Sequence, residues 1–566
     1  MSATDKGIGM FVRRNLIISL AGLTLLTHPA HAATISPLAV PDASSILAPP
    51  TTLPELPKRE VPKLKDNLNL PDGSSKLLSF KIARVRIVGA TKVDPRVIAK
   101  LFDPMLNKPV ASKDLKAALD QVTRIYADTG YALGRAYIPV QVMSGGTLIV
   151  RVVEGYIGRI TIKTESDAAR AVVARFGRHI TDEKPLRRET LERFLLLMSD
   201  VPGITVKGQL TGMDIYTGMA TMALVAEQEH VSTNMALDSR SNVKGLPFQV
   251  YLTGAINNIL GNGEKLALTT LASWKLDTQK YFRLAYSTLL GSDGLSLTTS
   301  ASYARSETEN SVYGYVFASH SKEVDTTLSY PLIRSKSENL YGGIGGYVSD
   351  VVNDLNGSRF SEDAIRAVFA DLRYTKTISP TLAIGATARV TQGLGVFNAG
   401  PSEMLHSRLG ARPWFTKARV SANVNYALDD DWLLSSSVEG QYSPNSLYAS
   451  EEISFGGSRF GRGFDTSEIS GDSGYGASVQ LQYQLKTNWI EGWNLRPYTF
   501  LDQSGVYNKS IDRQGNDRLV STGLGLSVSN QSWLAVTVEM DKPLNRDVFS
   551  QGNRNPRGYI SFQARL

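Results

Sequence analysis

Residues 474–485 read GYGASVQLQYQL, and this stretch decides the fold. Tyr, Ala, Val and Leu occupy its odd-numbered positions, whereas Gly, Ser and Gln occupy the even-numbered ones. A period of two is that of a β-strand, and an apolar face opposite a small, polar face suits lipid on one side and water on the other. The stretches 520–528 (VSTGLGLSV) and 560–566 (ISFQARL) follow the same rule. The sequence therefore predicts membrane-spanning β-strands.

Alternating segments of this kind recur from about Val231 onward. We count sixteen candidate strands in this region, and their connections alternate between short and long. The long connections lie near 306–322, 351–362, 393–412, 444–473 and 542–556. A soluble sandwich also has alternating strands, but short turns on one side and long loops on the other are typical of outer-membrane barrels. Residues 231–566 are therefore predicted to form a 16-stranded antiparallel transmembrane β-barrel.

The N-terminal residues have the composition of an export signal. Arg13 and Arg14 precede the apolar run LIISLAGLTLL, and small residues follow at 30–32 (AHA). This pattern predicts a secretory signal peptide over 1–32, because the apolar run is too short for a membrane span of ~20 residues. Residues 33–76 hold eight of the 24 prolines and are predicted to be an extended linker.

Two small modules are expected between the linker and the barrel. In 77–156 an alternating strand (SFKIARVRIVGA) is followed by two helical segments and two further strands. The second helix is expected to start with Ser112 as its N-cap and to stop at Gly130. The same β-α-α-β-β order recurs in 157–230, and such repeats usually provide binding surfaces. The predicted fold class is therefore α+β for the two modules and all-β for the barrel.

The first module resembles the first polypeptide-transport-associated (POTRA) domain of two-partner secretion transporters. The matching segments are IARVRIVGA, YADTGYALGRAYIPVQ and LIVRVVEGYIGRI. The matching residues are Gly89, Tyr126, Gly130, Tyr131, Pro139, Gln141, Glu154 and Gly155. The second module is similar to the second such domain, and YPLIRS (330–335) in the barrel also resembles this family. The resemblance implies a barrel in the outer membrane and two tandem POTRA domains in the periplasm.

A glycine-rich stretch, FGGSRFGRGF (455–464), lies in the predicted sixth extracellular loop, loop 6 (444–473). Its end, Gly461, Arg462, Gly463 and Phe464, is similar to the Val-Arg-Gly-Tyr/Phe motif of the outer-membrane assembly and secretion superfamily. This chain has glycine where valine is usual. In that superfamily the loop folds back into the barrel lumen, so the resemblance implies an inward-folded loop 6 here.

The superfamily also supplies a partner for the loop arginine. Its arginine meets an aspartate that lies in a Phe-x-Asp pattern on the barrel wall, and Phe500 and Asp502 match that pattern on the thirteenth predicted strand. A pair between Arg462 and Asp502 is therefore implied, with Phe464 packed against the wall. Arginine is suited to this role because its planar fork can hold a carboxylate bidentately. Gly505 lies three residues after Asp502, where closer matches have glycine two residues after.

The residues give no indication of catalysis. Outside the predicted signal peptide the histidines are scattered without ligand spacing, at His179, His230, His320 and His406. Phosphate-loop, HExxH and GxSxG motifs are absent from the sequence, as is cysteine. We therefore expect no catalytic residue, metal or cofactor. The net charge of +8 is spread along the chain, which argues against nucleic-acid binding.

The resemblance implies protein transport by type Vb, two-partner secretion. The POTRA domains would capture an unfolded exported partner, with strand edges as a binding surface. The partner would pass through the lumen and fold outside, and a large β-helical adhesin or haemolysin is expected. We expect a monomer in contact with outer-membrane lipid. Two alternatives stay open: a barrel-assembly insertase, which shares the loop motif but usually has more POTRA domains, and a barrel-type hydrolase.

Overall fold

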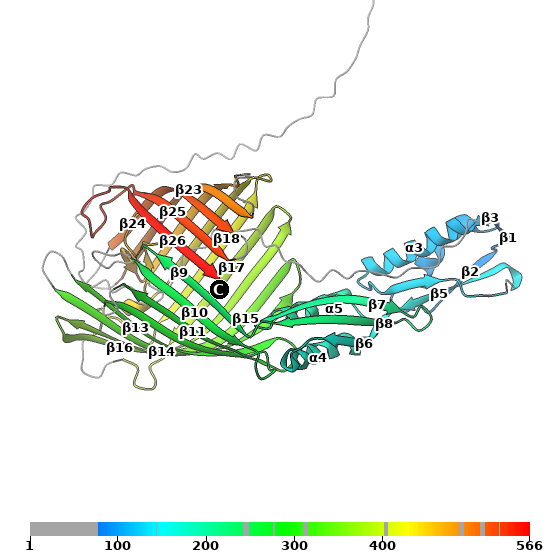
Figure 1. Ribbon diagram of the computed structural model, residues 1–566, viewed down its shortest axis with the longest axis horizontal. Helices are drawn as coiled ribbons and strands as arrows, with labels where there is room; N and C mark the ends of the chain where they lie inside the picture. The colour runs from blue at the N-terminus through cyan, green and yellow to red at the C-terminus, as the bar shows by residue number, and fades with distance from the viewer. Residues whose placement is uncertain are drawn as a thin grey trace, which may run out of the picture. The chain divides into compact units, whose positions relative to one another are not determined.

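The computed structural model of the protein describes residues 77–565, except for 143, 241–247, 275–277, 310–314, 401–405, 486–491, 510–514 and 531–532 (Figure 1). The predicted signal peptide (1–32) and proline-rich linker (33–76) lie outside the described residues. Among the residues it describes, no helix is both long and apolar enough to cross a membrane.

The first module contains a small mixed sheet covered by a helix. Its elements are β1 (Leu77–Lys81), β2 (Arg84–Val88), α2 (Pro95–Lys100), a 3-10 turn (Asp103–Met105), β3 (Pro109–Ala111), α3 (Ser112–Asp128), β4 (Gly134–Tyr137), a second 3-10 turn (Ser144–Gly146) and β5 (Thr147–Glu154). Strand β5 is central, with β2 parallel on one side and β4 antiparallel on the other. The buried face of α3 carries Leu115, Ala118, Val122 and Tyr126. The predicted N-cap, Ser112, is instead the first helical residue, after Ala111.

The second module repeats this topology. Its elements are β6 (Tyr156–Lys163), α4 (Asp167–Asp182), α5 (Arg188–Ser199), β7 (Ile204–Met213) and β8 (Met219–Gln228). Strand β8 is central, with β6 parallel and β7 antiparallel to it. Both helices pack on this sheet through an apolar core that includes Phe176, Phe194 and Met198. The repeat predicted from the sequence is confirmed at the level of strand order and direction.

The remaining strands close into one antiparallel barrel of sixteen strands. They are β9 (Val231–Asp238), β10 (Gln249–Asn257), β11 (Lys265–Ser273), β12 (Gln279–Leu290), β13 (Leu295–Glu309), β14 (Val316–Arg334), β15 (Glu338–Leu355), β16 (Ser358–Ser379), β17 (Leu382–Gly393), β18 (Thr416–Ala427), β19 (Trp432–Tyr442), β22 (Ser473–Tyr483), β23 (Trp493–Asn508), β24 (Gly515–Asn530), β25 (Leu534–Pro543) and β26 (Arg557–Arg565). The last strand, β26, pairs with the first, β9, and this seam closes the sheet (Figure 1). The predicted fold class and strand number are confirmed.

The faces of the barrel are inverted relative to a soluble protein. On β22, Val479 is 49% exposed, whereas its neighbours Ser478 and Gln480 are buried. Leu501 on β23 and Leu524 on β24 are likewise exposed apolar residues. This pattern of exposure is the one expected of a strand that faces lipid on the outside of the barrel and polar groups on the inside. The alternation that decided the fold thus corresponds to the two faces of the barrel wall.

Two of the predicted long loops are wrong. Most of 306–322 and 351–362 belongs to strands, since β15 and β16 are joined at Asn356 and Gly357 alone. Polar residues occupy both faces there, in stretches such as VSDVVNDL, so the apolar alternation ends although the strands continue. Outside the membrane, paired strands still satisfy their backbone hydrogen bonds, and they do not need an apolar face. Polarity therefore indicated where the lipid ends rather than where the strands end.

Candidate functional site

Loop 6 connects β19 to β22 and covers 443–472, close to the predicted 444–473. It contains a 3-10 turn (Ala449–Glu451) and a two-stranded hairpin of β20 (Ile453–Phe455) and β21 (Ile469–Gly471). Five of its apolar residues are buried in one cluster with the barrel-wall residues Val506 and Leu519 and with Val548; these loop residues are Ile453, Phe455, Phe460, Phe464 and Ile469. Loop 6 is thus folded into the barrel, and Phe464 packs in the cluster that it forms with the wall.

The tip of the loop requires glycine at two positions, for different reasons. Gly461 has φ of +75°, in the left-handed region that side chains rarely adopt. Gly463 lies against β25, and a Cβ there would be only 2.8 Å from the backbone nitrogen of Pro543. The conformation at 461 explains the departure from the family motif, because a β-branched valine is strongly disfavoured at positive φ.

The structure brings Arg462 and Asp502 together, but not as a bidentate pair. The guanidinium Nε of Arg462 is 3.8 Å from Oδ2 of Asp502, and the backbone N–H of Arg462 donates to the same oxygen at 3.2 Å. The other carboxylate oxygen of Asp502 accepts a hydrogen bond from the hydroxyl of Ser521. Asp502 therefore binds the backbone of the tip more directly than its side chain.

The guanidinium of Arg462 is shared among several wall groups. Its Nη1 donates to Oε1 of Gln480 at 3.0 Å and lies 3.4 Å from Glu539, while Nη2 donates to Ser478 at 3.3 Å. The guanidinium carbon lies 3.9 Å from the ring centre of Phe500, a cation–π contact. The two predicted wall residues, Phe500 and Asp502, thus contact the arginine, together with three polar groups from β22 and β25.

Sequence reasoning missed Arg240 and the acidic pair on β25. Arg240 donates to the carbonyl of Arg462 at 2.9 Å, to Asp541 at 2.9 Å and to Glu539. Because Arg240 lies two residues beyond the end of β9, it connects the closing seam of the barrel to the tip of loop 6. Two acidic residues at alternate positions of a membrane strand, Glu539 and Asp541, were the available signal, because such charges need a partner inside the barrel.

In the first module, two of the residues that carry the POTRA resemblance meet. The hydroxyl of Tyr126 donates to Oε1 of Glu154 at 2.8 Å, and the backbone N–H groups of Thr91 and Lys92 donate to the same oxygen at 2.6 and 2.7 Å. Burial opposes ionisation of Glu154, but these hydrogen bonds and the Thr91 hydroxyl outweigh it and lower the pKa of Glu154 below its ordinary value. Glu154 therefore ties the end of β5 to the loop before α2.

The other POTRA family residues shape turns and strand ends. Gly89 has φ of +90°, and Gly130, which ends α3, has φ of +94°. The side-chain amide of Gln141 pairs with the backbone of Ile149 in both directions, at 2.8 and 2.9 Å, and so extends the ladder of β5 beyond β4. The remaining family residues are Tyr131, whose N–H donates to the carbonyl of Tyr126, Pro139, half-buried after β4, and Gly155, close to the carbonyl of Leu133.

The lumen beside the loop tip is polar. A cavity there is lined by Arg459 and Arg462 of loop 6 and by wall residues that include Asn423, Ser436 and Gln480. In the part of the chain that the structure describes, no group of three or more His, Asp or Glu side chains could hold a metal ion. The arrangement provides a hydrophilic space, closed in part by the folded loop 6.

The family described as "Haemolysin secretion/activation protein ShlB/FhaC/HecB" matches residues 226–528, more than half of the chain. The chain belongs to this family. A ShlB-type POTRA domain also matches 80–155. Members of the family are two-partner secretion transporters, so the barrel lies in the outer membrane and the POTRA domains lie in the periplasm.

Individual relatives agree with this family. The heme/hemopexin transporter protein HuxB of Haemophilus influenzae is 21% identical over 493 residues, which cover 83% of this chain and 85% of HuxB. The outer membrane transporter CdiB of Dickeya dadantii is 23% identical over 508 residues, covering 85% of this chain and 86% of that protein. The solved structure of CdiB from Escherichia coli has the same fold, with a TM-score of 0.68 and 20% identity over 89% of this chain and 92% of that one.

Proposed function

We propose that this transporter secretes one exported protein through its barrel and that loop 6 closes the route until the client arrives. The observation that carries this proposal is the buried tip of loop 6, where Arg462 contacts groups on β22, β23 and β25. A chain passing through the lumen must displace this tip. The contacts of Arg462 therefore hold the closed state.

We further propose that residues 77–156 and 157–230 act as two client-binding POTRA domains below a barrel of 231–566. Within the described residues, β2 and β6 each pair with one strand only, β5 and β8 respectively. An unpaired strand edge offers backbone donors and acceptors to an extended client segment. Strand β6 also packs against α4, so a client strand added at its free edge would lie near a helix.

The client is proposed to be a large β-helical adhesin or haemolysin. Relatives are named as transporters of heme/hemopexin and of hemolysin, which supports an exported protein as cargo. Since the sequence has no nucleotide-binding motif, folding of the client outside the cell is the proposed driving force. We propose a monomer without enzymatic activity or cofactor, which contacts lipid through its exposed apolar face.

Secretion is favoured over barrel assembly and over hydrolysis. Barrel-assembly factors usually have more POTRA domains than the two proposed here, and the matching family is one of secretion proteins. A hydrolase would need a nucleophile beside a base, whereas the charged groups at the loop tip are arginines and carboxylates in ion pairs.

The test is the amount of client in the culture medium when Arg462→Ala is expressed with its client. We expect a folded barrel, visible by heat-modifiable gel mobility, and a strong loss of secretion. Arg412→Ala is the matched control, because Arg412 is an exposed loop arginine stacked on Trp414. Normal secretion by Arg462→Ala would contradict the role given to loop 6.

Deletion of 78–155 tests client capture separately. Secretion should be lost while the pore conductance of the purified barrel persists in planar bilayers. If secretion continues without these residues, the first POTRA domain does not capture the client.

A further inference from the structure

A second buried arginine lies at the base of loop 6, far in sequence from the motif at its tip. Arg408 precedes β18, and its Nη1 lies 2.6 Å from Oδ1 of Asp472 and 2.6 Å from Oε1 of Glu452. Glu452 immediately precedes β20 of the loop hairpin, and Asp472 immediately follows β21. One arginine from a neighbouring connection therefore joins the two ends of the hairpin of loop 6.

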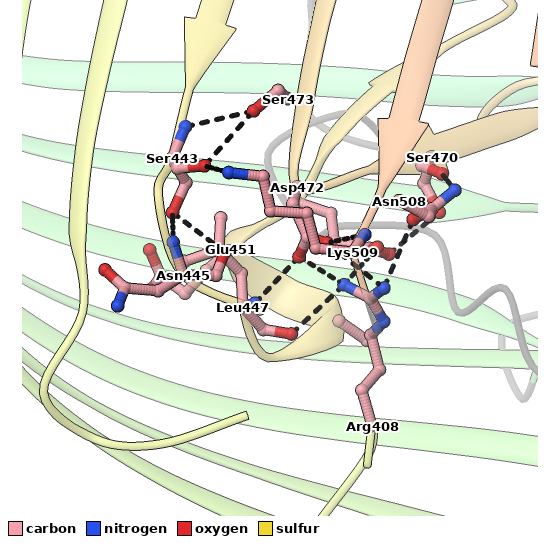
Figure 2. Close-up of polar contacts among 12 residues, drawn as sticks. Arg408, Ser443, Asn445, Leu447, Glu451, Ser470, Asp472, Ser473, Asn508 and Lys509 are labelled. Carbon is pink, nitrogen blue, oxygen red and sulfur yellow. Dashed lines mark hydrogen bonds and ion pairs between the residues drawn. The ribbon is translucent and has the colours of Figure 1, made fainter. Parts of the chain in front are cut away.

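Asp472 is the centre of this base cluster (Figure 2). Its carboxylate accepts hydrogen bonds from the backbone N–H of Leu447 at 2.7 Å and from that of Lys509 at 2.8 Å, in addition to Arg408. The side chain of Lys509 reaches back to the carbonyl of Ser443 at 2.8 Å. The cluster thus links the start and end of loop 6 to the end of β23.

Further contacts fix Arg408 and the base of the loop together. The arginine donates to the carbonyl of Leu447 at 3.2 Å and to Oδ1 of Asn508 at 3.2 Å. The backbone N–H of Ala449 donates to the hydroxyl of Ser407 at 3.0 Å. Leu447 and Tyr448 are fully buried in an apolar cluster that also contains Ile365, Ala367, Ala411 and Phe415. Polar and apolar contacts both attach this part of loop 6 to its neighbours.

The carboxylates at both ends of the loop keep neutral donors when their arginine departs, but only the tip keeps a second arginine. Asp502 retains the Ser521 hydroxyl, and Glu539 retains Arg240 and the Tyr498 hydroxyl. At the base, Asp472 retains two backbone N–H groups and Glu452 the Ser470 hydroxyl, but the two carboxylates lose the guanidinium of Arg408 that they share, which is itself only 5% exposed. Removing one partner of a buried charge pair is strongly unfavourable. Detaching the base therefore costs more than releasing the tip.

We propose that Arg408 is a positioning residue that keeps the base of loop 6 closed throughout secretion, so that the tip moves on a fixed base. This inference rests on the proposed secretion function. It assigns the motion to residues around 456–468 and excludes displacement of the whole loop. A fixed base keeps the released tip attached beside the wall, where it returns to Asp502 after the client has passed.

Two engineered disulfides distinguish a moving tip from a moving base, and the chain has no cysteine of its own to interfere. For the base, Ser407→Cys with Ala449→Cys joins residues whose Oγ and N atoms are 3.0 Å apart. For the tip, Phe460→Cys with Gly476→Cys joins a loop residue to β22, since a Cβ at Gly476 would lie 2.8 Å from Cγ of Phe460. These short contacts place the two residues of each pair side by side, and titration of the remaining free thiols shows that each disulfide has formed.

The expected results differ between the two links. The oxidised tip link abolishes secretion and a reductant restores it, whereas the oxidised base link leaves secretion at the level of the single-cysteine controls. If the base link blocks secretion as the tip link does, the base must open and the inference is overturned. If the tip link does not block secretion, the proposed role of loop 6 as a closure fails instead, so the two failures are distinguishable.

Rescue shows whether Arg408 acts by holding the base. Arg408→Met should cause a clear loss of secretion, because the base of loop 6 opens when its buried carboxylates lose their shared cation. It should also raise the conductance of the pore in planar bilayers. The oxidised base link introduced into Arg408→Met should restore both quantities. Failure of the link to restore either, in a barrel with normal heat-modifiable mobility, would contradict a positioning role. If Arg408→Met does not insert, the link in Arg408→Lys gives the same comparison.

Discussion

Loop 6 is held by one buried arginine at its tip and another at its base, and the two are paired differently. Arg462 at the tip shares its guanidinium among a glutamine, a serine, an aromatic ring and two carboxylates, the nearest carboxylate at 3.4 Å. Arg408 at the base lies 2.6 Å from each of two carboxylates. Several longer contacts suit a segment that must be released, whereas short charge pairs suit one that stays fixed. A single loop thus combines a movable part with a fixed part.

Loss of the base arginine should have the largest effect on stability. Arg408→Met leaves Glu452 and Asp472 buried without their shared cation, which should cost about 3–5 kcal/mol. The measurement is the temperature at which the heat-modifiable band converts to the unfolded one. An unchanged temperature, alongside an unchanged exposed-arginine control (Arg412→Ala), would remove the distinction between base and tip.

Loss of the tip arginine should have a smaller effect on stability and a large effect on transport. In Arg462→Ala the wall carboxylates keep Ser521 and Arg240 as donors, so we expect a cost of about 1–3 kcal/mol. The same gel assay should show a smaller decrease than for Arg408→Met. A decrease equal to that of the base variant would mean that the two anchors are equivalent.

Replacing Gly461 by valine, the usual family residue, should weaken the closed position of the tip by less than the loss of Arg462 does. Gly461→Val places a β-branched residue at φ of +75°, with an expected strain of about 1–2 kcal/mol. We expect more frequent open events in single-channel recordings, with normal membrane insertion. Gly457→Ala, at a second positive-φ glycine in the loop, is a control for general strain. Identical recordings from Gly461→Val and the unmodified protein would contradict the backbone account of this position.

Glu154 in the first POTRA domain provides a comparison outside loop 6, and we expect its protonation to have the smallest effect on stability. Because the pKa of folded Glu154 is below its ordinary value, the stabilisation is present above the unfolded pKa and is lost as the pH falls through the folded pKa. Hydrogen exchange at Thr91 and Lys92 should therefore accelerate, relative to the intrinsic rate, in acid. Glu154→Gln should remove this pH dependence; a variant that keeps it would exclude Glu154 as the cause.

Much of this fold was predictable because its pattern is local. Alternation such as that of 474–485 indicates a strand, its polar face and its lipid face within a dozen residues, and the glycine-rich tip stands out in the same way. The ends of β14, β15 and β16 were not predictable, since a strand beyond the membrane no longer needs an apolar face. Local patterns therefore predicted the architecture of the barrel but not how far these three strands extend beyond the membrane.

Only some of the residues on the barrel wall that contact loop 6 could be predicted from the sequence. Asp502 was found through a motif two strands beyond the start of the loop. Arg240 and Glu539 lie at opposite ends of the barrel sequence and meet because β9 pairs with β26, which pairs with β25. The base cluster joins Arg408, from the connection before β18, to Glu452 and Asp472 of loop 6, without a fixed spacing. Closure of the barrel creates the contacts of Arg240, and the inward folding of loop 6 creates those of Arg408, so no local pattern encodes either set.

The most direct test of the central claim is the level of secreted client from the Phe460→Cys, Gly476→Cys protein before and after a reductant is added. If the tip of loop 6 must leave its position for secretion, the oxidised protein secretes nothing above background and recovers on reduction. Secretion by the fully oxidised protein at the level of its single-cysteine controls would contradict the account.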